Sequence, residues 1–290
     1  MRNVTVAAVQ MQCSHILAEN LATAERLVRQ AAGQGAQIIL LPELFERPYF
    51  CQERQYDYYS YAKSVEENDA VQHFIPIARE LQVVIPISFY EKDGNSLYNS
   101  IAVIDADGSV LGVYRKTHIP DDHYYQEKFY FTPGNTGFKV WETRYAKIGI
   151  GICWDQWFPE CARSMALMGA ELLLYPTAIG SEPHDNTISS LRHWQRVQQG
   201  HAGANIMPLI ASNRIGTEVQ DDFDITFYGG SMICNPFGEI VAEMGTEAGV
   251  IVHEFDLDEI ASLRRNWGVF RDRRPDLYAP LLSKDGGVGR

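Results

Sequence analysis

Paired cysteine motifs are missing from this chain. Its 290 residues include five cysteines with no Cys-x-x-Cys among them: Cys13, Cys51, Cys153, Cys161 and Cys234. An odd, scattered set argues against a disulfide framework or a zinc ribbon and favours a reducing compartment. The first ten residues are typical of a β-strand and lack the apolar core of a signal peptide, and no apolar run is long enough to span a membrane. We therefore predict a cytoplasmic protein with no membrane partner.

Positive charge is also in short supply. The chain has 25 Lys and Arg against 37 Asp and Glu, which gives a net charge of -12. A nucleic-acid surface needs a basic patch, so this balance predicts no nucleic-acid partner. The same acidity tolerates a small cationic molecule and would attract one.

No Ser/Gly/Pro-rich linker divides the chain, so we predict one domain over residues 1–290. The hydrophobic pattern predicts strands at 4–11, 37–41, 83–91, 97–105, 109–115, 146–152, 171–175, 207–212 and 250–255, with a hairpin in 228–244. It predicts helices at 21–32, 69–81, 159–169, 189–205 and 257–266, and Pro76 implies a kink or a start in two pieces. Parallel crossovers mixed with hairpins indicate helices that cover two stacked sheets. Residues 267–290 read as an extended tail, which we expect to be an interface arm.

A cysteine stands at the end of one predicted strand, in Lys147-Ile-Gly-Ile-Gly-Ile-Cys153-Trp-Asp-Gln-Trp157. A turn from strand to helix is where many enzymes expose a nucleophile beside backbone N–H groups. Most free cysteines, however, are buried and inert. Cys153 by itself is therefore more typical of a core residue, and a nucleophile would need a base and an oxyanion partner elsewhere in the chain.

Charged residues follow two other predicted strands. Glu43 comes directly after the apolar run 37–41, where a carboxylate is costly to bury unless it is paired or functional. Lys116 ends the strand 109–115, and a lysine beside a thiol favours the thiolate. A solvated loop position for Glu43 and a solvated strand edge for Lys116 remain alternatives.

Taken together, Leu-Pro-Glu43, Tyr-Arg-Lys116 and Gly-Ile-Cys153-Trp-Asp resemble the three signature blocks of the nitrilase (carbon–nitrogen hydrolase) superfamily, in that family's order. Ser-Asn213-Arg214-Ile-Gly216 and Tyr228-Gly-Gly-Ser231 extend the likeness over nearly the whole chain. The resemblance implies an α/β fold, a four-layer α-β-β-α sandwich, and a cysteine amidase that needs no cofactor and no metal. It also implies a homo-oligomer.

The resemblance also implies a role for each matching residue. Cys153 would be the nucleophile, and Glu43 the general base that activates first the thiol and then water. Lys116 and the backbone N–H of Trp154 would hold the oxyanion. A second glutamate, Glu127, would orient Lys116 and the substrate amide.

Within the superfamily, the segments around Lys116, Glu127 and Cys153 resemble the N-carbamoylputrescine amidases. Members that act on carbamoyl amino acids bind a carboxylate, in some cases through arginines just after the nucleophile. Asp155 and Gln156 stand there instead and suit no anion. The expected substrate is therefore a small cationic ureido compound, N-carbamoylputrescine, cleaved to putrescine, carbon dioxide and ammonia through an S-carbamoyl enzyme.

An ω-ammonium group needs acidic or aromatic partners. The irregular loops offer several, and we expect some of them to line the pocket: Tyr49, Asp121, Asp122, Tyr124, Tyr125 and Tyr130, with Tyr56 and Tyr59 as further candidates.

Other functions stay open at this point. Another ureido- or ω-amide hydrolase, such as a β-ureidopropionase, is the main alternative. A silent subunit is disfavoured by the complete Glu-Lys-Cys set, and a redox role lacks a nearby resolving cysteine. His118, Asp121, Asp122 and His123 form a dense N/O set, but their spacing matches no metal motif.

Overall fold

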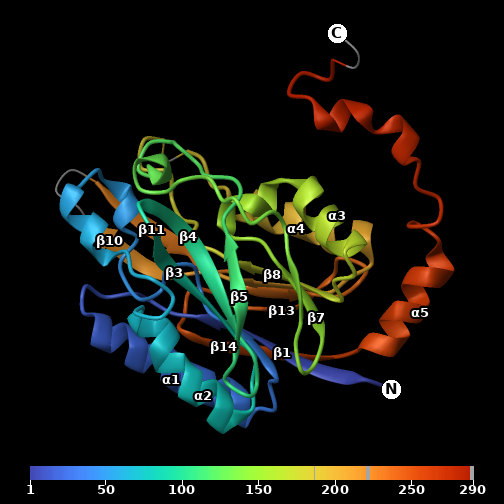
Figure 1. The fold of residues 1–290 in the computed structure, drawn as a ribbon, viewed down its shortest axis with the longest axis horizontal. Helices are drawn as coiled ribbons and strands as arrows, with labels where there is room; N and C mark the ends of the chain where they lie inside the picture. Colours follow the sequence, from blue (N-terminus) through green and yellow to red (C-terminus); the bar gives the residue numbers. More distant parts are fainter. Residues whose placement is uncertain (186, 220–222, 288–290) are drawn as a thin grey trace.

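Two β-sheets form the centre of the fold (Figure 1). The computed structural model describes residues 1–185, 187–219 and 223–287. The first sheet has the order β14-β1-β2 and continues into β3-β4-β5 through a parallel bridge between Ile38 and Val84. Its strands are β1 (Asn3–Gln10), β2 (Ile38–Leu40), β3 (Ile85–Asp93), β4 (Ser96–Ile104), β5 (Val110–Arg115) and β14 (Gly249–Asp256).

The second sheet has the order β13-β12-β9-β8-β7-β6. Its strands are β6 (Val140–Glu142), β7 (Lys147–Ile150), β8 (Leu172–Pro176), β9 (Leu209–Ser212), β12 (Met232–Cys234) and β13 (Ile240–Glu243). β7, β8 and β9 are parallel, as the predicted β-α-β unit requires. A separate antiparallel hairpin joins β10 (Ile215–Val219) to β11 (Asp224–Tyr228).

Helices cover the outer faces of both sheets, so the fold has four layers. α1 (Leu17–Gly33) and α2 (Asp69–Leu81) pack on the first sheet, and α3 (Pro159–Leu167) and α4 (Leu191–Asn205) pack on the second. α5 (Leu257–Trp267) follows β14. The predicted α-β-β-α sandwich is confirmed.

Three apolar clusters separate the four layers, and β1 shows how one strand serves two of them. Val6 and Ala8 lie in the cluster between the sheets, together with Ile150 of β7. Ala7 and Val9 lie in the cluster beneath α1 and α2. Successive side chains of a strand point to opposite faces, so a strand covered on both faces reads as a continuous apolar run.

Local signals set the ends of several helices. The side chain of Asn68 caps α2 by accepting a hydrogen bond of 2.9 Å from the N–H of Val71. α2 is one continuous helix that contains Pro76, so it does not begin in two pieces. Asp256 caps the start of α5, and Gly268 ends that helix in the left-handed conformation.

The structure departs from the sequence prediction in several places. α1 begins at Leu17, one turn before the predicted start at residue 21. β6 was not predicted, because three residues are too few to show an alternating pattern. The hairpin of β10 and β11 was also missed, because Glu218 is a buried carboxylate at a position where an apolar residue would have signalled a strand.

Phe270 still packs on the core beneath α3 and α4, and the chain beyond it runs away from the four layers with two short 3₁₀ turns, Pro275–Leu277 and Ala279–Leu282 (Figure 1). Positions 288–290 of the predicted tail lie outside the described residues. Among residues 1–185, 187–219 and 223–287, no helix has the length and apolar character needed to cross a bilayer.

Candidate active site

The three charged or nucleophilic residues singled out in the sequence each follow a strand. Glu43 lies beyond β2, Lys116 directly follows β5, and Cys153 lies beyond β7. β1 and β2 are parallel, as are β7, β8 and β9, so the carboxyl ends of these strands share an edge in each sheet. Face-to-face packing of the sheets brings the two edges together over one buried site.

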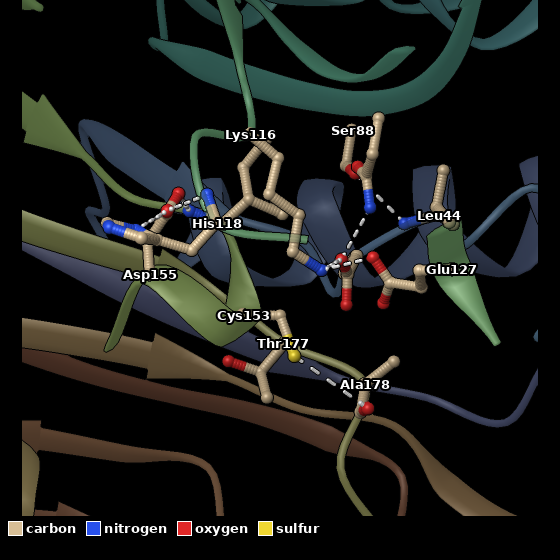
Figure 2. A network of polar contacts seen from close by, with 12 residues as sticks. Leu44, Ser88, Lys116, His118, Glu127, Cys153, Asp155, Thr177 and Ala178 are labelled. Atoms are coloured by element: carbon tan, nitrogen blue, oxygen red, sulfur yellow. Dashed lines mark hydrogen bonds and ion pairs between the residues drawn. The ribbon is translucent and has the colours of Figure 1, made fainter. Parts of the chain in front are cut away.

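Lys116 lies between Glu43 and Glu127, and Figure 2 shows its side chain beside Glu127. Its Nζ donates to Oε1 of Glu43 at 2.8 Å and to Oε2 of Glu127 at 2.6 Å. All three side chains are fully buried. Burial opposes the charge on the ammonium, but the two carboxylates outweigh it and raise the pKa of Lys116 well above its usual value. Lys116 is therefore a permanent cation shared by two anions.

The two oxygens of Glu43 have different surroundings. Oε1 accepts from Lys116 and, at 2.7 Å, from Nδ2 of Asn99. Oε2 is buried and has no hydrogen-bond partner among the described residues. A buried carboxylate oxygen is rarely left unpaired, and this one remains available to accept a proton.

Both oxygens of Glu127 are occupied. Oε2 takes the Lys116 ammonium, and Oε1 accepts from the hydroxyl of Tyr49 at 2.7 Å. Burial raises the pKa of Glu127 to about 7, Lys116 opposes the rise, and the negative charge of Glu43 adds to it. Glu127 thus contacts both Lys116 and Tyr49, and it also lines the cavity beside Cys153.

Cys153 occupies a strained turn at the start of a 3₁₀ helix, Cys153–Trp157. Its φ of +41° is rare for a non-glycine residue. Burial and the charge of Glu43 raise the pKa of the Cys153 thiol well above its usual value, although Lys116 acts in the opposite direction. The expectation that Lys116 would favour the thiolate is therefore outweighed by burial. A thiol with a raised pKa would need a base before it could act as a nucleophile.

The glycines before Cys153 allow close packing of α3 on β7. A Cβ on Gly149 would come within 2.9 Å of the Cβ of Met165, and one on Gly151 within 2.8 Å of the ring of Tyr175. A larger residue at 149 would push α3 away from β7, and one at 151 would collide with Tyr175 of β8 and with the sulfur of Cys161 in α3, 3.1 Å away. The Gly-Ile-Gly-Ile run is thus a packing requirement of this strand.

Asp155 ties the Cys153 turn to the Lys116 segment. Its carboxylate accepts from Ile152 N–H at 2.9 Å, from Tyr114 hydroxyl at 2.7 Å, and from both the backbone N–H (3.0 Å) and Nδ1 (2.7 Å) of His118 (Figure 2). Tyr114 and His118 flank Lys116 in the sequence. Asp155 therefore connects these two segments through hydrogen bonds. It does not line the cavity, so it has no direct part in substrate specificity.

A cavity of about 270 Å³ opens beside Cys153. It is lined by Tyr49, Pro120, Asp122, Tyr125, Glu127, Cys153, Trp154, Gln156, Trp157, Ala178, Ile179, Glu182, Ser190 and His193. Two carboxylates, Asp122 and Glu182, accompany Glu127, and neither lysine nor arginine is among these lining residues. Burial and the neighbouring Asp122 raise the pKa of Glu182, while His184 opposes the rise.

Comparison with known proteins identifies the family to which this arrangement belongs. The profile of the carbon-nitrogen hydrolase family matches residues 5–265. The chain belongs to the carbon-nitrogen hydrolase family. It is a hydrolase of amide carbon–nitrogen bonds.

Relatives match this hydrolase along its whole length. An N-carbamoylputrescine amidase of Oryza sativa is 58% identical over 98% of this chain and 96% of that protein. A citrullinase of Francisella tularensis is 54% identical over 98% of this chain and all of that protein. A carbon-nitrogen hydrolase of Helicobacter pylori has the same fold, with a TM-score of 0.92 and 37% identity over 98% of this chain and 99% of that one.

The predicted substrate-contacting residues of the hydrolase divide into two groups. Tyr49, Asp122 and Tyr125 line the cavity. Asp121, Tyr124 and Tyr130 do not, because other contacts engage them. The Tyr130 hydroxyl binds backbone groups of residues 53 and 55, the Tyr124 ring packs on Phe223, and Asp121 faces Arg54.

Sequence reasoning missed several lining residues, among them Glu182, Ser190 and His193 from the chain after β8 and Trp157 from the turn that begins at Cys153. The only signal for Glu182 was its position in Ser-Glu-Pro-His-Asp, shortly after a buried strand. No spacing rule connects that segment to Cys153.

The alternative metal set is dispersed in the hydrolase. His118 binds Asp155 and stacks on Phe158 with ring centres 3.7 Å apart, whereas His123 lies beside His184. Across the described ranges, no three His, Cys, Asp or Glu side chains are grouped so that they could hold a metal ion.

Proposed function

We propose that this hydrolase cleaves the ureido group of N-carbamoylputrescine to give putrescine, carbon dioxide and ammonia. The observation that carries the proposal is the cavity: it has a cysteine at one end, carboxylates on its wall, and no lysine or arginine in its lining. Plant relatives named N-carbamoylputrescine amidase, 57–58% identical over their whole length, support it.

The carboxylates of Asp122 and Glu182 would bind the distal ammonium of the substrate. Burial raises the pKa of Glu182, His184 opposes the rise, and the like charge of Asp122 adds to it. A cation placed between them removes that repulsion and forms charge-assisted hydrogen bonds. The rings of Tyr125 and Trp157 in the lining suit the apolar methylene chain.

The reaction would begin with proton transfer from the Cys153 thiol to Oε2 of Glu43, the unpartnered oxygen. The sulfur attacks the ureido carbon, and the oxyanion is held by Lys116 and the N–H of Trp154. Glu43 returns the proton to the departing nitrogen, which leaves as amine or ammonia. When the amine leaves first, the S-carbamoyl enzyme is hydrolysed by water activated by Glu43, and the carbamate breaks down to carbon dioxide and ammonia. When ammonia leaves first, the acyl group keeps the diamine chain, and its carbamate breaks down to carbon dioxide and putrescine.

The test is ammonia release from purified protein given N-carbamoylputrescine, N-carbamoyl-β-alanine, citrulline and a simple ω-amide. We expect the highest kcat/KM for N-carbamoylputrescine, and no turnover by Cys153→Ala. Preference for the β-alanine derivative would refute the diamine specificity, and turnover by Cys153→Ala would refute the mechanism. Loss of activity on chelation would point to a metal.

Citrulline is a second candidate substrate, because a specific observation favours it. Citrulline carries a carboxylate beside its ammonium. Gln156 was predicted to suit no anion, but its Nε2, like Nε1 of Trp157 and Oγ of Ser190, has no hydrogen-bond partner among the described residues. All three residues line the cavity, and the citrullinase relative is 54% identical. N-carbamoyl-β-alanine has no ammonium that could pair with Asp122 and Glu182. The structure therefore favours β-ureidopropionase activity less than either of the other two activities.

We further propose that the chain is a cytoplasmic homo-oligomer in which the tail after Trp267 contacts a second copy. All five cysteines are free, as expected in a reducing compartment. The tail exposes three leucines by 61 to 92%: Leu277, Leu281 and Leu282. Exposed leucines on a segment that leaves the body of the protein are typical of an arm that packs against a partner.

A further inference from the structure

A buried ion pair lies behind the active site and does not line the substrate cavity. Arg214 follows β9, and Glu218 lies on β10. Nη1 of Arg214 donates to Oε1 of Glu218 at 3.0 Å, with the two side chains 0% and 7% exposed. Burying two charges is costly and stabilises little by itself. The position of this pair calls for a reason beyond stability.

Arg214 forms hydrogen bonds with the backbone around Glu43. Nε and Nη2 donate to the carbonyl of Glu43 at 3.1 and 3.0 Å, and Nη2 also donates to the carbonyl of Leu44. Leu44 has a φ of +48°, which is strained for a leucine. The guanidinium thus fixes the peptide groups on both sides of a residue that would otherwise relax, and relaxation would turn the Glu43 side chain.

Glu218 is connected to Glu127 by hydrogen bonds through Tyr49. Its Oε2 accepts from the backbone N–H of Tyr49 at 2.7 Å and from Nε2 of Gln52 at 2.9 Å. The hydroxyl of the same Tyr49 donates to Oε1 of Glu127 at 2.7 Å. One ion pair is therefore connected to both carboxylates that share the Lys116 ammonium.

We propose that Arg214 and Glu218 are positioning residues that set the placement of Glu43 and Glu127 around Lys116, and through it the rate of proton transfer from Cys153. The inference rests on the proposed roles of Glu43, Glu127 and Cys153. Neither member of the pair lines the cavity. Their loss therefore affects kcat and leaves KM nearly unchanged.

The first variant is Arg214→Lys, which keeps the charge but cannot reproduce the several donors of a guanidinium. Its matched control is Arg264→Lys. Arg264 also donates to two backbone carbonyls, those of Ile206 and Ala170. These carbonyls precede β9 and β8, so they lie at the ends of the strands opposite to the active site. A misplacement of about 1 Å costs roughly 10²-fold in rate, so kcat should fall by roughly 10- to 100-fold in Arg214→Lys and stay within about twofold in the control.

The second variant, Arg214→Met with Glu218→Met, removes both charges and so leaves no uncompensated ion in the interior. We expect it to fold, as judged by circular dichroism and melting temperature, with kcat as low as that of Arg214→Lys. A folded double variant with wild-type kcat would overturn the proposal.

Alkylation of Cys153 by iodoacetamide supplies a readout that needs no substrate. Its rate depends on removal of the thiol proton, so it should fall in Arg214→Lys and in Glu43→Gln and remain unchanged in Arg264→Lys. If the wild type hydrolyses none of the ureido compounds, the proposed function fails while the alkylation comparison still decides the positioning role. Equal alkylation rates in wild type and Arg214→Lys would refute that role.

Discussion

Replacing Glu127 by glutamine should inactivate the enzyme and leave it folded. The substitution keeps the volume of the side chain and its bond to Tyr49, and it removes one of two carboxylates that share Lys116. Lys116 keeps its ion pair with Glu43 at 2.8 Å, so no buried charge is left unpaired. The free energy of unfolding should therefore change by about 1 kcal/mol or less, in contrast to the 3–5 kcal/mol typical of a broken buried pair.

Catalysis should respond much more strongly than stability. Without Glu127, the ammonium moves toward Glu43, which displaces the proposed oxyanion donor. The loss of one aligned donor typically costs about 10²–10³ in kcat, or roughly 3–4 kcal/mol of transition-state stabilisation. Lys116→Met is the comparison variant, because it leaves two buried carboxylates without a counter-charge. It should lose activity and about 3–5 kcal/mol of unfolding free energy.

The assay combines ammonia release with urea unfolding of each variant. Glu46→Gln is the matched control, because Glu46 is another buried glutamate, paired with Asn68 and outside the cavity. It should retain wild-type kcat. The reasoning would be refuted if Glu127→Gln kept kcat within about threefold of wild type, or if it unfolded as readily as Lys116→Met.

Three further predictions concern other parts of the structure. Glu182→Gln should raise KM for N-carbamoylputrescine about tenfold with little change in kcat, and leave KM for the uncharged n-butylurea unaltered; equal effects on both substrates would contradict an ammonium site. The pKa of Glu182 is raised by burial, so its charge is lost earlier than that of an ordinary glutamate as pH falls, and KM for the cationic substrate should rise in that direction. Burial raises the pKa of Glu46 from 4.5 to about 7, so the folded state holds its proton more tightly and stability falls as pH rises through that window. Glu46→Gln lacks this loss and should be more stable than wild type above pH 7 by on the order of 3 kcal/mol, as measured by urea unfolding at several pH values. Removal of the chain after Gly268 should reduce the oligomer size in analytical ultracentrifugation without unfolding the sandwich, and an unchanged mass would refute the interface arm.

Features that depend on neighbours in the sequence were predictable. The apolar run of β1 and the bounds of α2, Asp69–Leu81, follow from side-chain patterns within a few residues. The three blocks around Glu43, Lys116 and Cys153 were recognised for the same reason, since each is a short run at the end of a strand. Where the pattern was short or carried a buried charge, as in β6 and β10, the prediction missed the strand.

The sequence by itself determined the family, the four-layer fold and the side chains available to the chemistry, because apolar periodicity and strand-end motifs are local properties. Only the tertiary structure decided what each charged group does. Asp155 ties two strands together, Arg214 grips the backbone of a residue 171 positions away, and Glu182 joins the cavity wall. The physical reason is burial, because the cost of removing a charge from water depends on every neighbour in space. At Cys153, burial raises the pKa of the thiol by more than the Lys116 ammonium lowers it.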